Sequence, residues 1–197
     1  MISQRIDTPS GCVLVARMAQ LEALETSATA EELQSVASFS SCSRRRERLA
    51  WRALLRESQG EQVEVGYKES GAPIILNSPY KYISVSHSRT HVAIALSHTP
   101  CGVDIESLDR DFSKVASRYM RDEERVLSCE EWWSAAVWCA KETLYKVAQP
   151  EGVDLLSGLR IEALDSEASV IEARVMQGEP IRLGLKFVED QMLVYTL

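Results

Sequence analysis

The sequence lacks any long uncharged apolar run. Its 197 residues are 45% hydrophobic and 26% charged. No stretch approaches the roughly 18 consecutive apolar residues of a membrane-spanning helix, so we expect no membrane partner. The N-terminal segment also lacks a basic start followed by an apolar run, and we expect no signal peptide. This composition is typical of a soluble globular protein that is long enough to bury a core of its own.

Paired cysteines are lacking as well. The five cysteines are an odd number, and none of them forms a C-x-x-C pair. This argues against a disulfide framework and against a structural zinc site. A zinc site at His87 and His91 would need two further ligands at a suitable spacing, and we find none. We therefore expect a reducing, cytoplasmic setting.

An excess of positive charge is absent too, since the formal net charge is -7 at pH 7. Wholesale binding to a phosphate backbone is excluded on this ground, and we expect no nucleic-acid partner. The densest basic patch is SRRRERLAWR at 43–52. Such a run is usually the solvated face of a helix. Arginine also suits bidentate phosphate binding, so a local site for one phosphorylated small molecule stays open.

Several common catalytic signatures are missing. The chain has no G-x-S-x-G elbow, no Walker loop and no G-x-G-x-x-G fingerprint. A serine hydrolase of the elbow type, a P-loop enzyme and a dinucleotide-binding domain therefore have no support in the sequence. Any chemistry has to come from other residues.

Capping and breaking residues mark the helices that we expect. Thr29 and Glu32 have the spacing of a capping box. Gly60 is placed to end one helix, and Pro150 is placed to stop another. The expected helices are 29–39, 41–58, 113–127 (one helix or a pair) and 130–149.

Short runs rich in β-branched residues indicate the strands. They alternate with the helices in the order strand, helices, strands, and this order repeats with a seam near residue 100. We therefore expect an α+β protein of two similar lobes, residues 1–100 and 101–197, and a monomer. The expected strands are 11–18, 63–67, 73–76, 82–88, 91–97 and 102–106, with four more after Gly158.

The segment GVDIE at 102–106 carries two carboxylates. Because side chains alternate along a strand, Asp104 and Glu106 share one face and Ile105 lies on the other. Two like charges on one face repel each other, and a divalent cation with a preference for oxygen ligands would remove this cost. A solvated strand face is the simpler interpretation of this segment taken alone.

The segment WCAKETLYK at 138–146 places a third carboxylate in an apolar helix. Glu142 is available as a further metal ligand, while Lys141 and Lys146 are available to phosphate oxygens as point charges. The simpler interpretation is an i,i+4 ion pair between Glu142 and Lys146, which would contribute only about 0.2–0.5 kcal/mol.

The segment YISVSHS at 82–88 ends in Ser86, His87 and Ser88. A histidine at a strand end can donate to a phosphate or accept a proton. Most histidines in such positions have no catalytic role, so this segment carries little weight by itself.

Together, three blocks resemble the 4′-phosphopantetheinyl transferase superfamily in its surfactin-type, two-lobed class. The family's G-(V/I)-D-(I/V)-E block is similar to Gly102–Glu106, and its W-x-x-K-E-(A/S)-x-x-K block is similar to Trp138–Lys146. An upstream S-H-S block is similar to Ser86–Ser88. The order and spacing of the three blocks make the resemblance specific. It covers roughly 41–155, and the second lobe is short for this class.

The resemblance implies a reaction and a set of partners. Coenzyme A and Mg²⁺ would bind between two α+β lobes. The phosphopantetheine arm would move to a serine of an acyl or peptidyl carrier protein, and 3′,5′-ADP would be released. The attacking hydroxyl belongs to the carrier, which is consistent with the missing nucleophile motifs.

By the same resemblance, the matching positions receive roles. Asp104, Glu106 and Glu142 would hold the metal, and Glu142 or a metal-bound water would help to take the serine proton. Lys146 and His87 would contact the diphosphate beside Ser86, and Lys141 would lie nearby. The remaining coenzyme A contacts implied for the 3′-phosphate are Arg44 or Arg45.

The chain departs from the family pattern in two places. A G-K-P sequence often precedes the S-H-S block, but this chain has Ala72 between Gly71 and Pro73. The residue after Lys-Glu is Thr143 in place of Ala or Ser. The missing lysine favours one alternative, a non-catalytic module that binds coenzyme A or a carrier protein. A metal-dependent hydrolase that uses the same carboxylates is a further alternative.

Overall fold

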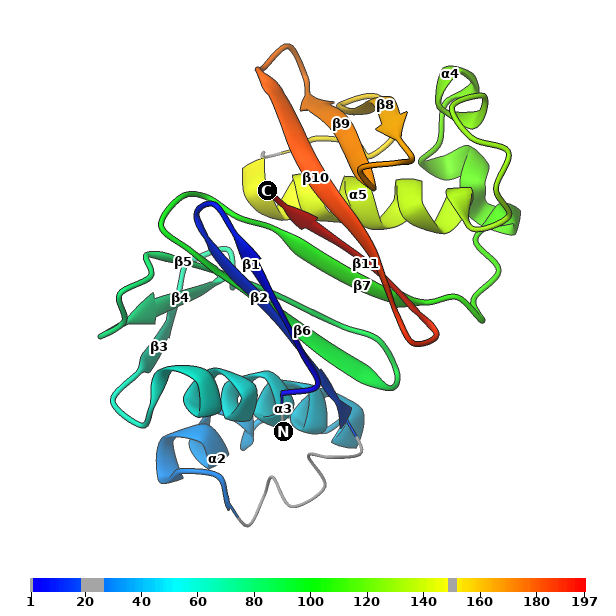
Figure 1. Cartoon of the computed structure of the whole chain (residues 1–197). Coiled ribbons are helices and arrows are strands. Elements are labelled where there is room, and N and C mark those ends of the chain that lie inside the picture. The colour runs from blue at the N-terminus through cyan, green and yellow to red at the C-terminus, as the bar shows by residue number, and fades with distance from the viewer. Residues whose placement is uncertain (1, 19–26, 149–151) are drawn as a thin grey trace. The chain divides into compact units, whose positions relative to one another are not determined.

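The computed structural model describes residues 2–18, 27–148 and 152–197 (Figure 1). Within these residues the protein is a mixed α+β structure that divides into two compact units, Met1–Thr99 and Pro100–Leu197. None of the described helices combines the length and the hydropathy that crossing a membrane requires.

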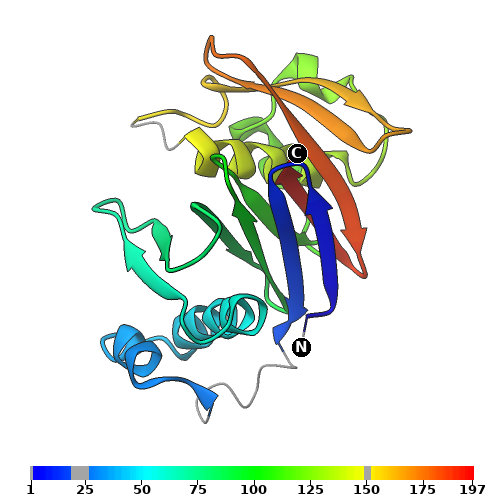
Figure 2. The same cartoon turned by 60° about the vertical axis from the view of Figure 1, so that its left-hand side comes forward.

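Unit 1 (Met1–Thr99) contains an antiparallel sheet of four strands in the order β1-β2-β6-β5. The apolar strand β2 (Gly11–Arg17) pairs with β6 (His91–Ser97) at the centre of this sheet. The strands β3 and β4 form a separate two-stranded antiparallel sheet, as Figure 2 shows. The remaining strands of unit 1 are β1 (Gln4–Thr8), β3 (Glu64–Tyr67), β4 (Pro73–Leu76) and β5 (Tyr82–His87).

In unit 1, α2 (Ala30–Val36) begins and α3 (Cys42–Gln59) ends at the capping residues that predicted these helix ends, while α2 ends at Val36, before the expected residue 39. Thr29 and Glu32 form the capping box of α2. Ser41 caps α3, and Gly60 ends it with a φ of 87°. The apolar face of α3 packs on β2 and β6 and forms the core of this unit with Leu14, Leu54 and Ile94.

Unit 2 (Pro100–Leu197) contains an antiparallel sheet of five strands in the order β7-β11-β10-β9-β8. The helix α5 (Trp133–Ala148) lies along one face of this sheet and contacts β7, β8, β9 and β11 (Figure 1). Short helices precede α5 in the chain. The other elements of unit 2 are β7 (Val103–Ser107), η2 (Ser113–Arg118), α4 (Asp122–Arg125), β8 (Leu159–Asp165), β9 (Val170–Val175), β10 (Pro180–Val188) and β11 (Gln191–Thr196).

The start of β7 lies directly against the backbone of α5. A Cβ atom at Gly102 would collide with the carbonyl oxygen of Thr143 and with the side chain of Val147. The Thr143 hydroxyl also donates to the carbonyl oxygen of Val194 in β11, at 3.1 Å. The glycine of the GVDIE segment therefore permits the close approach of the strand to the helix, and the register between β7 and α5 is fixed at this point.

The elements expected from periodicity are confirmed, with one omission and some shorter ends. The segment 113–127 forms η2 and α4 rather than one long helix. The helix expected at 130–149 begins at Trp133, and Pro150 lies outside the described residues. The omission is β1, whose sequence QRIDT has only one large aliphatic residue and whose side chains are only partly buried or exposed.

Candidate functional site

The carboxylates of β7 lie on its helix-facing side. Asp104 Oδ1 is 2.8 Å from Lys146 Nζ, and Glu106 Oε1 accepts from the indole nitrogen of Trp138 at 3.0 Å. Ile105, the residue between Asp104 and Glu106 in the sequence, is fully buried and points to the opposite face of the sheet. The alternation expected for this segment is therefore confirmed, and both carboxylates meet side chains of α5.

The helix α5 presents the matching face. Trp138, Glu142 and Lys146 are four residues apart, so they lie one above another along the helix. Trp138 contacts Glu106, and Lys146 contacts Asp104. Glu142 lies one helical turn from both Trp138 and Lys146. We name the group Asp104, Glu106, Glu142 and Lys146 the carboxylate cluster.

Burial and repulsion shape the electrostatics of this cluster. Burial is the largest effect that raises the pKa of Glu142, and the carboxylates of Asp104 and Glu106 raise it further, against Lys146. Burial likewise raises the pKa of Glu106, and Asp104 adds to it. Three mutually repelling carboxylates on two rigid elements are the oxygen donor set that a hard divalent cation such as Mg²⁺ prefers. The chemistry of these three side chains therefore suits a metal ion, although in the described structure their ligand atoms do not all lie within 4.8 Å of one another.

Resident cations offset part of the negative charge. Besides Asp104, Lys146 Nζ donates to the carbonyl oxygen of Val103 at 2.9 Å. Arg110 Nη1 is 2.9 Å from Glu106 Oε1. The simple i,i+4 pairing of Lys146 with Glu142 is thus replaced by an ion pair across to β7.

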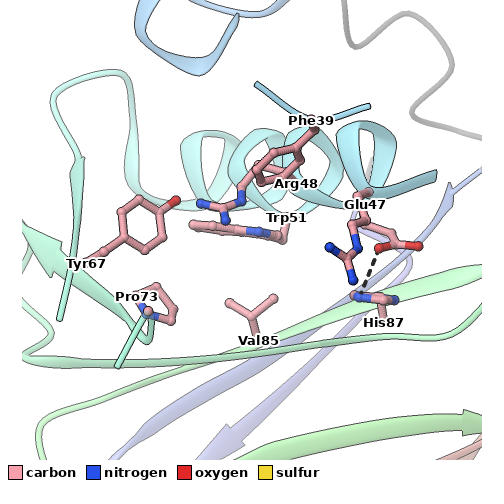
Figure 3. Close-up of a pocket in the computed structure, with 10 residues that line it drawn as sticks. Phe39, Glu47, Arg48, Trp51, Tyr67, Pro73, Val85 and His87 are labelled. Carbon is pink, nitrogen blue, oxygen red and sulfur yellow. Dashed lines mark ion pairs between the residues drawn. The ribbon is translucent and has the colours of Figure 1, made fainter. Parts of the chain in front are cut away.

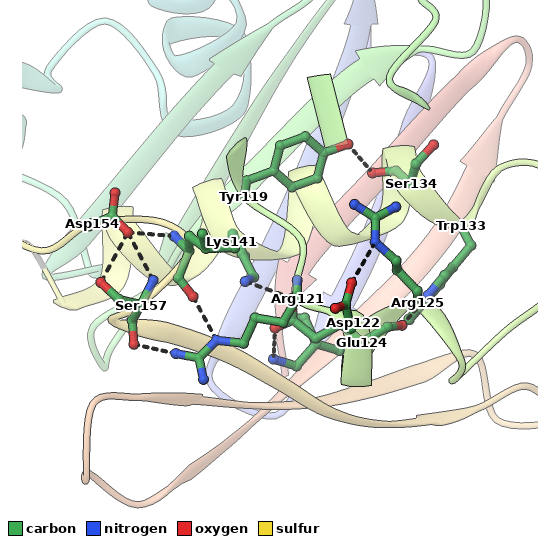
Figure 4. Close-up of polar contacts among 12 residues, drawn as sticks. Tyr119, Arg121, Asp122, Glu124, Arg125, Trp133, Ser134, Lys141, Asp154 and Ser157 are labelled. Carbon is green, nitrogen blue, oxygen red and sulfur yellow. Dashed lines mark hydrogen bonds and ion pairs between the residues drawn. The ribbon is translucent and has the colours of Figure 1, made fainter. Parts of the chain in front are cut away.

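Lys141 is placed away from this cluster, in contrast to the expectation that it lies near phosphate. It is one residue before Glu142, which turns it about 100° around the helix. Its Nζ is 2.8 Å from Glu124 Oε2, and neither side chain is more than 1% exposed. Figure 4 shows Lys141 and Glu124 among their polar neighbours. An ammonium group enclosed in this way has no access to a phosphate, so we interpret Lys141 as a structural residue.

Glu124 is held by more than the lysine. Its carboxylate also accepts from the backbone nitrogens of Arg121 and Ile161, both at 2.8 Å. Burial lowers the pKa of Lys141, and Glu124 opposes this effect. The ion pair joins α4, α5 and β8 inside unit 2.

Unit 1 contains a separate pocket of about 370 Å³. Figure 3 shows the guanidinium of Arg48 between Phe39 and Tyr67, and its central carbon is 5.2 Å and 4.6 Å from the two ring centroids. His87 Nε2 lies 3.4 Å from Glu47 Oε2 at one end of the pocket. The lining also includes Arg44, Trp51, Gly71, Pro73 and Val85.

The structure separates the other residues expected to bind coenzyme A. Arg44 lines this pocket, whereas Arg45 Nη1 donates to the carbonyl oxygen of Val36 at 3.2 Å. His87 lines the pocket together with Val85, two residues before it on β5. Ser86 lies between them in the strand and therefore points to the opposite face of the sheet.

Sequence reasoning did not select several residues of these two places. In the pocket these are Glu47 and Trp51, whereas Arg48 lies in the basic run that the sequence singled out; the spacing i, i+3, i+4, i+7 from Arg44 places all of them on one helix face. Beside the carboxylate cluster, the residue that sequence reasoning did not select is Arg110. It lies beyond the end of β7, where the alternation of a strand no longer predicts which way a side chain points. Only the folded loop brings it to Glu106.

Comparison with known proteins gives one positive finding. A model of the family described as the 4′-phosphopantetheinyl transferase superfamily matches residues 100–191, which include the whole carboxylate cluster. No curated protein matches the chain. The resemblance that the motifs indicated is therefore confirmed over residues 100–191, the part of the chain that matches the model of the 4′-phosphopantetheinyl transferase superfamily.

Proposed function

We propose that this protein transfers the 4′-phosphopantetheine arm of coenzyme A to a serine of an acyl or peptidyl carrier protein, in an Mg²⁺-dependent reaction that releases 3′,5′-ADP. The observation that carries the proposal is the gathering of three carboxylates and one lysine on β7 and α5, within the region that matches the family. The superfamily supports phosphopantetheinyl transfer in general. The metal, the substrates and the residue roles are our inference.

Asp104, Glu106 and Glu142 would hold the metal. When bound, a divalent cation supplies positive charge to the oxygens of a diphosphate, on which negative charge develops during the transfer. Asp104 and Glu106 come from a strand and Glu142 from a helix, so the positions of all three are set by regular elements rather than by loops.

Glu142 is the candidate for the proton acceptor. Its pKa is raised by burial and by the two neighbouring carboxylates. A carboxylate with a raised pKa is a stronger base, and Glu142 would accept the proton of the serine hydroxyl when it is not itself coordinated, because a bound cation lowers the pKa of its ligands. Lys146 is partly exposed, with 26% of its side chain accessible. Its ammonium group is available to an incoming phosphate oxygen as a point charge.

The pocket of unit 1 is the candidate for the nucleotide end of coenzyme A. Its volume lies in the range of small-molecule sites, and it combines aromatic rings with Arg44, Arg48 and His87. Rings and arginines of this kind suit a planar base and a phosphate group. Titration with 3′,5′-ADP, followed by the fluorescence of Trp51, tests this part, and Arg44→Gln is expected to weaken binding.

The transfer itself is tested by the mass of the carrier. The protein is mixed with coenzyme A, Mg²⁺ and an apo carrier protein, and the carrier is weighed by mass spectrometry. Transfer adds about 340 Da, as expected from the chemistry of the arm. A panel of carriers from fatty-acid, polyketide and peptide synthesis identifies the substrate.

A binding module is the second candidate, and Ala72 is the residue that favours it. This residue stands between Gly71 and Pro73, which both line the pocket, where the family often has a lysine. Binding of coenzyme A or the carrier without any mass gain would support the module. Consumption of coenzyme A without an acceptor would support a hydrolase instead.

A further inference from the structure

Arg110 contacts the carboxylate cluster from outside the motif blocks. It lies three residues beyond the end of β7, and its Nη1 donates to Glu106 Oε1 at 2.9 Å. Trp138 Nε1 donates to the same oxygen at 3.0 Å. Oε1 of Glu106 is therefore engaged by two donors at once, one of which carries a full positive charge.

Two aromatic rings hold the guanidinium in this place. Its central carbon is 4.6 Å from the ring centroid of Phe112 and 5.3 Å from that of Trp138. Attraction between a cation and ring faces stabilises this position, and the planar guanidinium stacks better than an ammonium would. The side chain of Arg110 is 48% exposed, so ions from solvent can reach it.

The charges of the neighbourhood nearly balance without any added ion. Asp104, Glu106 and Glu142 contribute three negative charges, and Lys146 and Arg110 contribute two positive ones. Lys146 is paired with Asp104, and Arg110 is paired with Glu106. A divalent cation at the carboxylates therefore meets two resident positive charges within a partly buried region, where screening by water is incomplete.

We propose that Arg110 is a resident counter-ion that competes with the divalent cation for Glu106 and thereby sets the metal affinity of the carboxylate cluster. The inference rests on the metal site of the proposed function. It adds a positioning residue, because Arg110 acts on the metal only through Glu106 and through its charge. The exposed guanidinium, unlike the buried Lys141, is free to turn away from Glu106 when a stronger cation arrives.

The test is a titration of the full chain with Mn²⁺, in which the free ion is measured by electron paramagnetic resonance. Arg110→Gln is expected to bind Mn²⁺ about tenfold more tightly than the wild type, since one repelling charge is removed from a partly screened site. Arg110→Lys keeps the charge and is expected to keep the weaker affinity. In an E106Q background, the same R110Q change is expected to have a smaller effect, because the competition for the Glu106 carboxylate is gone and only the repulsion by the charge remains.

A matched control removes a positive charge elsewhere in unit 2. Arg125 forms an exposed pair with Asp122 at 3.5 Å, and R125Q is expected to leave the Mn²⁺ affinity unchanged. Thermal unfolding of every variant accompanies the titration. Because Arg110 is half exposed, the variants are expected to fold, and R110K separates the loss of the charge from the loss of the guanidinium's packing.

The outcomes separate this inference from the proposed function. If the wild type binds Mn²⁺ and R110Q binds it equally or more weakly, the role of Arg110 is overturned while the metal assignment stands. If the Mn²⁺ affinity of R110K rises as much as that of R110Q, the charge of Arg110 is not the cause of the weaker binding in the wild type. If neither the wild type nor R110Q binds Mn²⁺, the metal assignment of the cluster is overturned, and the role of Arg110 with it. None of these readings requires transfer activity.

Discussion

The buried pair of Lys141 and Glu124 allows a quantitative prediction. We consider Lys141→Met, which keeps the length of the side chain and fills nearly the same volume, so the cavity it leaves is small. The change removes the ammonium and leaves the carboxylate of Glu124 buried, with 1% exposure. Removal of one partner of a buried ion pair costs about 3–5 kcal/mol of unfolding free energy.

The structure places the expected cost at the lower end of this range. After the substitution Glu124 still accepts from the backbone nitrogens of Arg121 and Ile161 at 2.8 Å. We therefore expect a loss of about 3 kcal/mol for Lys141→Met. The double variant K141M/E124Q removes the stranded charge but keeps a carbonyl acceptor, and we expect it to recover about half of the loss.

Equilibrium unfolding in urea measures this effect, with the fluorescence of Trp133 and Trp138 reporting on unit 2. For an m-value of about 1–3 kcal/mol/M, the midpoint of K141M should fall by about 1–3 M. Lys114→Met is the matched control, since its side chain is 79% exposed and pairs only with Asp111 at 3.1 Å. It should change stability by less than about 0.5 kcal/mol.

The reasoning is refuted if K141M unfolds at the same urea concentration as K114M. Equal stability would mean that Lys141 is not enclosed with Glu124, and its availability to a phosphate would have to be considered again. A loss in K141M that the double variant does not reduce would show that the stranded carboxylate is not the cause.

Three further predictions concern the cluster and its support. Asp104→Asn and Glu142→Gln should each abolish transfer in the carrier mass assay while circular dichroism stays unchanged, and unchanged turnover would remove the metal assignment. The pKa values of Glu106 and Glu142 are raised from their usual 4.5, so both groups hold their protons more tightly in the folded protein than in the unfolded one. The folding free energy that they contribute is fully present below the unfolded pKa. It is lost as the pH rises through the raised folded pKa values. Glu142→Gln should therefore raise the melting temperature of the metal-free protein at pH 7, and a lower melting temperature would contradict the repulsion inferred from the structure. Gly102→Ala should cost about 1–3 kcal/mol in urea unfolding because its Cβ meets the Thr143 carbonyl, and a neutral effect would show that β7 can move away from α5.

Local signals predicted the elements well because the contacts that decide them are close in sequence. The capping box of Thr29 and Glu32 and the terminating role of Gly60 are confirmed as expected. The strand β1 was not predicted, because QRIDT forms its pairs with β2 and has no apolar alternation of its own. The seam near residue 100 was visible only as a repeat in element order.

The candidate site was predictable where a period applies and not where tertiary contacts decide. Period two placed Asp104 and Glu106 on one face, and the structure shows both against α5. Lys141 was misjudged because its partner, Glu124, lies on another element, and the motif spacing gives no information about it. Arg110 and the aromatic rings around it come together only through the loop after β7.

The close seating of β7 on α5 has a consequence for heat and denaturant. The strand and the helix that carry the carboxylates also form part of the central packing of unit 2, with Ala140 and Leu144 in its core. Local opening that exposes one of these elements would disrupt much of the unit. The amides of α5, and those amides of β7 that pair with β11, should accordingly exchange their hydrogens among the slowest of this unit, and the chemistry of the cluster should persist until the unit melts as a whole.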